Sequence, residues 1–126
     1  MSLTSTASTY EVLNIEELLA RCLGNASFAT RVLTKFQDRL EVDLRELDEA
    51  IQARDSAAVA SVAHRIKGAS ANVAAPQLHE CSAEIERWGR AGCLADMPDS
   101  VDRLRREWSR FVDQAATLDL GSRDVR

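Results

Sequence analysis

Apolar side chains recur at intervals of three and four residues throughout the segment 27–53, and this period is the strongest constraint on the fold. Over about seven helical turns it places them on one face of a single long helix. The residues of this face are Phe28, Val32, Leu33, Phe36, Leu40, Leu44, Leu47 and Ile51. A helix cannot bury such a face by itself, so the rest of the chain must supply partners for it.

The same period predicts four more helices, at about 14–23, 56–74, 76–91 and 98–118. Asn14 and Asp55 are suited to cap the starts of two of them, and Pro76 suits a first helical turn. Turn formers are scarce, with five Gly and two Pro in 126 residues. We therefore predict an all-α fold, an antiparallel four-helix bundle with a short additional N-terminal helix.

The sequence predicts one domain between two short flanking segments. The bundle is expected over residues 11–119, the size of an ordinary single domain. Residues 1–10 are small and polar, without the basic start and apolar centre of a signal peptide, and are expected to be disordered. Residues 120–126 are expected to form a frayed C-terminal tail.

Charge and cysteine content argue against several classes of function. The net charge of −4 argues against nucleic acid as the main partner. Three cysteines without a CxxC pair suggest neither a disulfide framework nor a zinc site, and reduced thiols fit a cytoplasmic protein. No apolar run reaches the roughly 18 residues of a membrane span. We expect no cofactor. We also expect a monomer, because the bundle can close its core within one chain.

The helix expected at 56–74 places a histidine opposite its apolar side. At about 100° per residue, the imidazole of His64 projects roughly 170° from the core-facing side chains, toward solvent or a partner. The core-facing residues are Val59, Val62, Ile66, Ala69 and Val73. Periodicity alone leaves open an idle surface histidine, and we interpret His79 as one because it lacks comparable surroundings.

Small residues surround His64, whereas an outer helix face ordinarily carries long charged side chains. The expected outer face of the segment 27–53 illustrates the contrast with Arg39, Asp43, Glu46 and Glu49. Within two turns of His64 the neighbours are Ala60, Ser61, Lys67, Gly68, Ala71 and Ala75. We expect a convex surface that admits a partner protein, with the five small residues as its contacts.

Gly68 lies in the middle of this helix, where glycine costs about 1 kcal/mol relative to alanine. The apolar period continues past it to Val73, so no turn is expected there. A small residue at this point lets another macromolecule come close to His64. The alternative is that Gly68 is a C-cap that ends a shorter helix.

The segment 64–74 resembles the signature of the histidine phosphotransfer (HPt) family. That family has a histidine, an aliphatic residue two positions on, Lys three on, Gly four on, often Ser six on, and an aliphatic residue nine on. The matching residues are His64, Ile66, Lys67, Gly68, Ser70 and Val73. The resemblance extends over about residues 12–112. One departure is Ala74, where the family commonly has Gly, and it concerns the chain geometry near the helix end.

The resemblance implies a histidine-containing phosphotransfer protein that accepts and donates a phosphoryl group on Nε2 of His64. Its partners would be receiver domains of response regulators or hybrid histidine kinases, whose aspartates exchange the group in a two-component phosphorelay. Any Mg²⁺ would belong to the receiver, so we expect no metal site, and a phosphoryl carrier rather than an enzyme. The chain could act alone or form part of a hybrid sensor histidine kinase.

Two further residues are candidates for the chemistry that the resemblance implies. Lys67 lies one turn after His64, where its ammonium can screen phosphoryl oxygens; otherwise it is a solvated lysine. Glu86 occupies a place where the family often has Glu or Gln on the next helix. Its carboxylate could accept a hydrogen bond from Nδ1–H and leave Nε2 free to attack, or it could pair on the surface with Arg90 or Arg87.

Two other functions compete with that of a carrier. A hydrolase or transferase that uses His64 would need converging acids, bases and nucleophiles, and only Glu86 is available near that face. A non-phosphorylated helical-bundle adaptor that binds signalling proteins would explain the bundle and the small residues. It would leave the position of Lys67 beside His64 as a coincidence.

Overall fold

The computed structural model describes residues 11–118, and within them the chain forms helices and no strand. The helices are α2 (Ile15–Arg21), α3 (Ala26–Gln52), α4 (Ser56–Asn72), α5 (Pro76–Ala91), the 3₁₀ helix η1 (Leu94–Asp96) and α6 (Pro98–Thr117). The predicted N-terminal segment 1–10, the last domain residue 119 and the tail 120–126 lie outside the described residues. Within residues 11–118, no helix combines the length and the apolar character that crossing a membrane requires.

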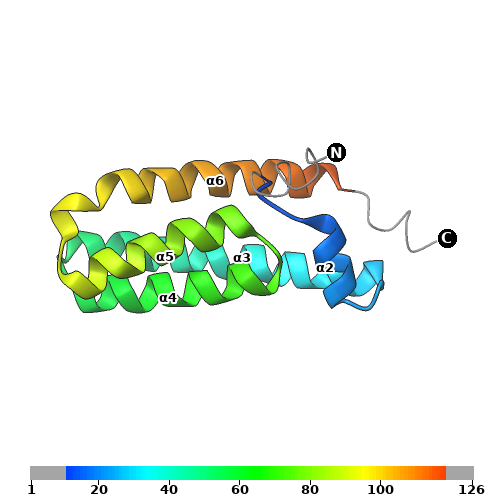
Figure 1. Ribbon diagram of the computed structural model, residues 1–126, viewed down its shortest axis with the longest axis horizontal. Helices are drawn as coiled ribbons and strands as arrows, with labels where there is room; N and C mark the ends of the chain where they lie inside the picture. Colours follow the sequence, from blue (N-terminus) through cyan, green and yellow to red (C-terminus); the bar gives the residue numbers. More distant parts are fainter. Residues whose placement is uncertain (1–10, 119–126) are drawn as a thin grey trace, which may run out of the picture.

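The four long helices α3, α4, α5 and α6 run side by side in alternating directions, and α2 crosses the end of the bundle where α3 begins (Figure 1). α4 packs against both α3 and α5, and α5 also packs against α6. Short connections join helices that are neighbours in space, which is the usual topology of such bundles. The predicted antiparallel four-helix bundle with a short additional N-terminal helix is therefore confirmed.

Capping residues set where several helices begin and end. The side chain of Asn14 accepts a hydrogen bond from the backbone N–H of Glu17 at 3.0 Å, and that of Asp55 accepts one from Ala58 at 3.0 Å. Both caps satisfy a backbone donor that the first helical turn leaves unpaired, as the sequence predicts. Gly92 ends α5 in a left-handed conformation with a φ of 72°.

Ala74 follows α4 with a φ of 60°, a left-handed conformation that glycine adopts more readily than alanine. Its carbonyl oxygen accepts a hydrogen bond from the backbone N–H of Asn14 at 2.8 Å, which ties the start of α2 to the turn between α4 and α5. The chain thus makes a glycine-type turn with an alanine. The alanine therefore leaves the path of the chain between α4 and α5 as a glycine would allow it, with backbone strain at this one residue.

The apolar faces of the helices meet in one core. At one part of it, Phe36 of α3 contacts Phe111 of α6 edge-on with ring centroids 5.2 Å apart, and Trp108 stacks on Phe111 at 5.6 Å. On α4, Ser70 is fully buried whereas Ala69, predicted as a core residue, is only half-buried. The buried face of α4 is thus wider than the predicted one and rotated relative to it, because this helix packs against both α3 and α5.

The prediction that Asp43 belongs to the outer face of α3 is wrong. The residue is 1% exposed, and its Oδ1 accepts a hydrogen bond from Nη2 of Arg65 on α4 at 3.0 Å. Arg39, one turn earlier on α3, lies 3.2 Å from the same oxygen. These two cations offset the cost of removing a carboxylate from water, so Asp43 joins α3 to α4 rather than facing solvent.

Candidate functional site

His64 lies in the middle of α4 with its side chain 62% exposed, as the helical period predicts. α4 continues past Gly68 to Asn72, so the alternative in which Gly68 ends a shorter helix is wrong. A Cβ added to Gly68 would have no contact within 4 Å apart from its own helix, as far as the described residues are concerned. The ring is therefore accessible from outside the bundle, and the surface one turn further on is open.

The carboxylate of Glu86 reaches from α5 to the histidine ring. Its Oε2 lies 3.1 Å from Nδ1 of His64, and its Oε1 lies 2.8 Å from Nζ of Lys67. Oε2 also accepts a hydrogen bond from Nε of Arg90, one turn later on α5, at 2.9 Å. The two alternatives for Glu86 thus occur together, because one carboxylate contacts the ring of His64 and pairs with Arg90.

Glu86 is ionised although it is buried. With 4% of its surface exposed, desolvation alone would raise the pKa of the carboxyl group. The hydrogen bond from Lys67, joined by those from Arg90 and His64, outweighs this effect and lowers the pKa of Glu86 to about 2. An ionised carboxylate only accepts hydrogen bonds, so its contact with His64 requires a proton on Nδ1. In the neutral ring, Nε2 then carries the lone pair.

The small residues predicted around His64 do not all reach the surface. Ser61 and Gly68 are exposed, Ala71 is half-buried, Ala60 is 7% exposed and Ala75 is 0% exposed. The prediction that Ala75 contacts a partner is wrong, because this residue is the N-cap of α5 and packs into the core at the turn between two helices. Ala60 is largely covered because α5 passes close to α4 at this point.

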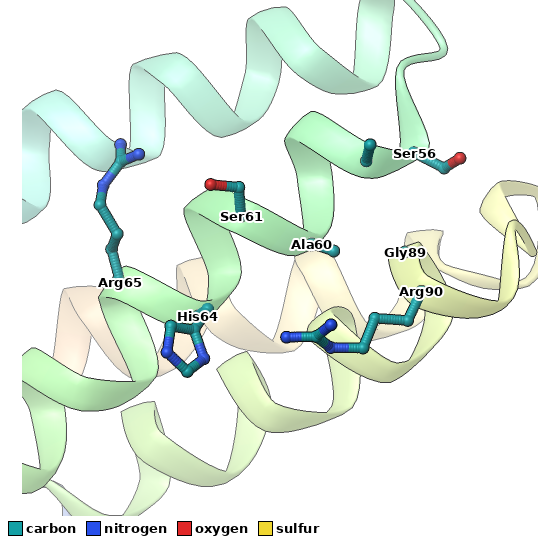
Figure 2. A pocket seen from close by; sticks show the side chains of 8 residues that line it. Ser56, Ala60, Ser61, His64, Arg65, Gly89 and Arg90 are labelled. Atoms are coloured by element: carbon teal, nitrogen blue, oxygen red, sulfur yellow. The ribbon is translucent and has the colours of Figure 1, made fainter.

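A hollow lies beside His64, where the sequence predicts a convex surface. Its volume is about 570 Å³, and it lies between the first half of α4 and the end of α5 (Figure 2). The lining residues are Ser56, Ala57, Ala60, Ser61, His64, Arg65, Gly89 and Arg90. Because most of these side chains are small, the space above the contact between the two helices stays open, and the expectation of a convex face is wrong on this side of the ring.

Gly89 explains how closely the two helices approach. A Cβ on this residue would lie 2.8 Å from the backbone nitrogen of Ala60 and 3.0 Å from the carbonyl oxygen of Ser56. Any side chain here would push α5 away from α4. Gly89 is absent from the residues that the sequence singles out. A glycine inside a helix, paired with alanines on the preceding helix, is the signal that could have identified it.

Arg65 follows His64 in the chain but turns away from the ring, toward α3 (Figure 2). Its Nη2 donates a hydrogen bond to Asp43 at 3.0 Å and also pairs with Glu46. Acidic residues of α3 thereby hold a bulky cation away from the imidazole. The period of a single helix could not predict this, because the ion pairs join residues of two different helices.

Neither a metal-binding cluster nor the thiol of Cys81 offers a second centre within residues 11–118. No group of three or more His, Cys, Asp or Glu in that range could hold a metal ion. Burial raises the pKa of the Cys81 thiol to about 11, so this cysteine stays protonated and acts as a small apolar residue.

Comparisons with known proteins agree with this geometry. The family model described as the Hpt domain matches residues 31–114. The structure resembles histidine-containing phosphotransfer protein B (HptB) from Pseudomonas aeruginosa PAO1, with a TM-score of 0.76 and 26% identity, over 87% of this chain and 99% of that chain. A search among curated proteins gives no match.

A second solved structure shares the fold. It is the HPT domain from the Hpt sensor hybrid histidine kinase from Shewanella, with a TM-score of 0.72 and 21% identity, over 83% of this chain and 91% of that chain. The family model covers more than half of the chain. This protein therefore belongs to the HPt family and has a histidine phosphotransfer role in a phosphorelay.

Proposed function

We propose that His64 is the residue that carries the phosphoryl group. The observation that most directly supports this is the 3.1 Å contact between its Nδ1 and the carboxylate of Glu86. This contact fixes the proton on Nδ1 and leaves the lone pair of Nε2 on an exposed, oriented ring. Nε2 attacks the phosphorus of a phosphoaspartate on a receiver; the N–P bond forms, the P–O bond breaks, and the aspartate leaves as a carboxylate. The reverse reaction returns the group to an aspartate.

Lys67 supplies positive charge for the group on His64. Phosphoryl transfer depends mainly on positioning and charge neutralisation. The ammonium of Lys67 is held 2.8 Å from Glu86, and its side chain is 31% exposed, so rotation of the flexible stem can bring it to oxygens bound at Nε2. While the ring is neutral, Lys67, Arg90 and Glu86 together carry one net positive charge, which favours an anionic group.

The partner is a receiver domain that docks over the face of α4 around His64. The exposed or half-buried small residues Ser61, Gly68 and Ala71 leave room for its approach, and the hollow beside the ring adds to that room. We infer a phosphoryl carrier rather than an enzyme, since Glu86 serves the ring and adds no second nucleophile. We also infer a monomer in the cytoplasm, where the free thiols of Cys22 and Cys81 stay reduced.

The test is to mix the chain with a receiver that carries labelled phosphate on its aspartate. We expect label on this chain that is labile in acid and stable in base, as a phosphorus–nitrogen bond requires. His64→Gln should abolish the label, whereas the matched control His79→Gln should keep it. Circular dichroism checks that both variants fold. Label that survives His64→Gln would refute the proposal.

A further inference from the structure

One buried carboxylate is shared by three donors at the ring of His64. The carboxylate of Glu86 accepts hydrogen bonds from three nitrogens. They are Nδ1 of His64 at 3.1 Å, Nζ of Lys67 at 2.8 Å and Nε of Arg90 at 2.9 Å. The ion pairs of this region join Lys67 of α4 and Arg90 of α5 to Glu86 of α5. Others join Arg65 of α4 to Asp43 and Glu46 of α3, and Arg39 of α3 to Asp43. The two acids of α3 are paired with Arg65, so Glu86 is the anion that the ring itself contacts.

Phosphorylation at Nε2 changes what the other ring nitrogen can do. The nitrogen Nδ1 can keep its proton, which makes the ring a cation, or it can release the proton and become an acceptor. A released proton would leave the lone pair of Nδ1 facing Oε2 of Glu86 across 3.1 Å, with no hydrogen between two acceptors. A retained proton keeps the hydrogen bond and adds an ion pair to it.

The charges of the cluster favour the retained proton. A phosphoryl dianion together with the carboxylate of Glu86 brings three negative charges. Lys67, Arg90 and a cationic ring bring three positive charges, so the cluster is neutral only when Nδ1 keeps its proton. The ring of His64 is 62% exposed, and solvent therefore screens part of this effect.

We propose that Glu86 is a positioning residue that keeps the proton on Nδ1 of phosphorylated His64, so that the phosphoryl group leaves from a cationic ring. This inference rests on the proposed role of His64. In the step toward a receiver, the P–O bond to aspartate forms and the N–P bond breaks, with its electron pair returning to Nε2. The proton on Nδ1 never leaves, and the ring ends as the same neutral tautomer that began the cycle. A cationic ring is the better leaving group, which suits a carrier that must donate as readily as it accepts.

The test uses the full chain and phosphoramidate as a small phosphoryl donor, so no partner has to be identified. The nitrogen NMR signals of phosphorylated His64 are followed across pH in the wild type and in Glu86→Gln. Glutamine has the same shape and its amide oxygen can still accept from Nδ1–H, so the substitution removes charge but not orientation. We expect the titration midpoint of Nδ1 to be higher in the wild type by about one pH unit. His79, the second of the chain's two histidines, is the internal reference, and its signals should be the same in both proteins.

A second variant should shift the titration midpoint of phosphorylated His64 in the opposite direction. Arg90→Gln removes a competing cation from Glu86, so the midpoint of phosphorylated His64 should rise above that of the wild type. Equal midpoints in the wild type and Glu86→Gln, or a fall in Arg90→Gln, would overturn the inference while leaving His64 as the carrier. No phosphate on His64 of the folded wild type would instead count against the proposed function itself.

Discussion

Two glycines lie inside helices of the bundle, Gly68 in α4 and Gly89 in α5, and alanine should act in opposite directions at them. Within a helix, alanine is more favourable than glycine by about 1 kcal/mol. At Gly68 a Cβ would contact nothing beyond its own helix within 4 Å among the described residues, so this gain acts alone. At Gly89 the same atom would lie 2.8 Å from the backbone nitrogen of Ala60 and 3.0 Å from its Cα.

The expected changes in the free energy of unfolding follow from these contacts. Gly68→Ala should raise it by about 1 kcal/mol, which corresponds to a rise in Tm of roughly 4 °C for a domain of this size. At Gly89 the opposing atoms belong to the backbone and cannot rotate away, so α5 must shift from α4. Overpacking of this kind costs about 1–3 kcal/mol. Combined with the helix preference of alanine, the net loss for Gly89→Ala should be about 1 kcal/mol.

Urea unfolding measures both variants against the wild type. Circular dichroism reports the helices, and the fluorescence of Trp88 and Trp108 reports the packing of α5 and α6. If Gly89→Ala is as stable as Gly68→Ala, the helices are not in contact through the backbone at Gly89. If Gly68→Ala is less stable than the wild type, the surface at Gly68 is not open, and the glycine does not serve to admit a partner.

Four other changes test the site and the turn. Gly68→Arg should keep the circular dichroism spectrum but reduce transfer from a receiver, because its bulk blocks docking; normal transfer kinetics would contradict this. Lys67→Ala should slow transfer by on the order of tenfold while weakening receiver binding less, and a pure loss of affinity would argue against charge neutralisation. Ala74→Gly should raise the free energy of unfolding in urea by about 0.5–1 kcal/mol, because glycine adopts a φ of 60° without the strain that alanine has there. A less stable variant would show that Ala74 is not strained. The pKa of Glu86 is lowered from 4.5 to about 2 in the folded chain, so its contribution to stability is present above the unfolded value and is lost as pH falls toward 2. Between about pH 5 and pH 2.5, the Tm of Glu86→Gln should therefore fall less than the Tm of the wild type. An equal fall in both proteins would argue against an ionised, paired carboxylate.

Features that repeat within one helix could be predicted from the sequence. The face of α3 repeats over its whole length, and its members Phe36, Leu40 and Leu47 are buried as expected. The exposure of His64 follows from the same reasoning, because a residue opposite an apolar face has no neighbour to cover it. The contact of Glu86 with the ring is one of two alternatives that the sequence leaves open, because only the family resemblance indicates its role.

Features that depend on how two helices meet could not be predicted in this way. Asp43 looks like a surface acid in the pattern of α3, yet it is buried because Arg65 arrives from α4. Ala75 continues the small-residue pattern beyond His64, but α4 ends at Asn72 and the following turn carries Ala75 into the core. In each case the periodicity of one helix is intact, and the error comes from the neighbouring helix or from the point where the helix stops.

The close contact between α4 and α5 also sets the surroundings of His64. Ala60 lies four residues before His64, and Gly89 lies three residues after Glu86, so on antiparallel helices the two contacts are one turn apart. With no side chain at Gly89, the helices approach closely enough for a glutamate to reach Nδ1 at 3.1 Å. The buried carboxylate is tolerated because three side chains donate to it. Gly89 thus sets the separation of the helices, and at that separation Glu86 can hold a proton on Nδ1, as the proposed attack by Nε2 requires.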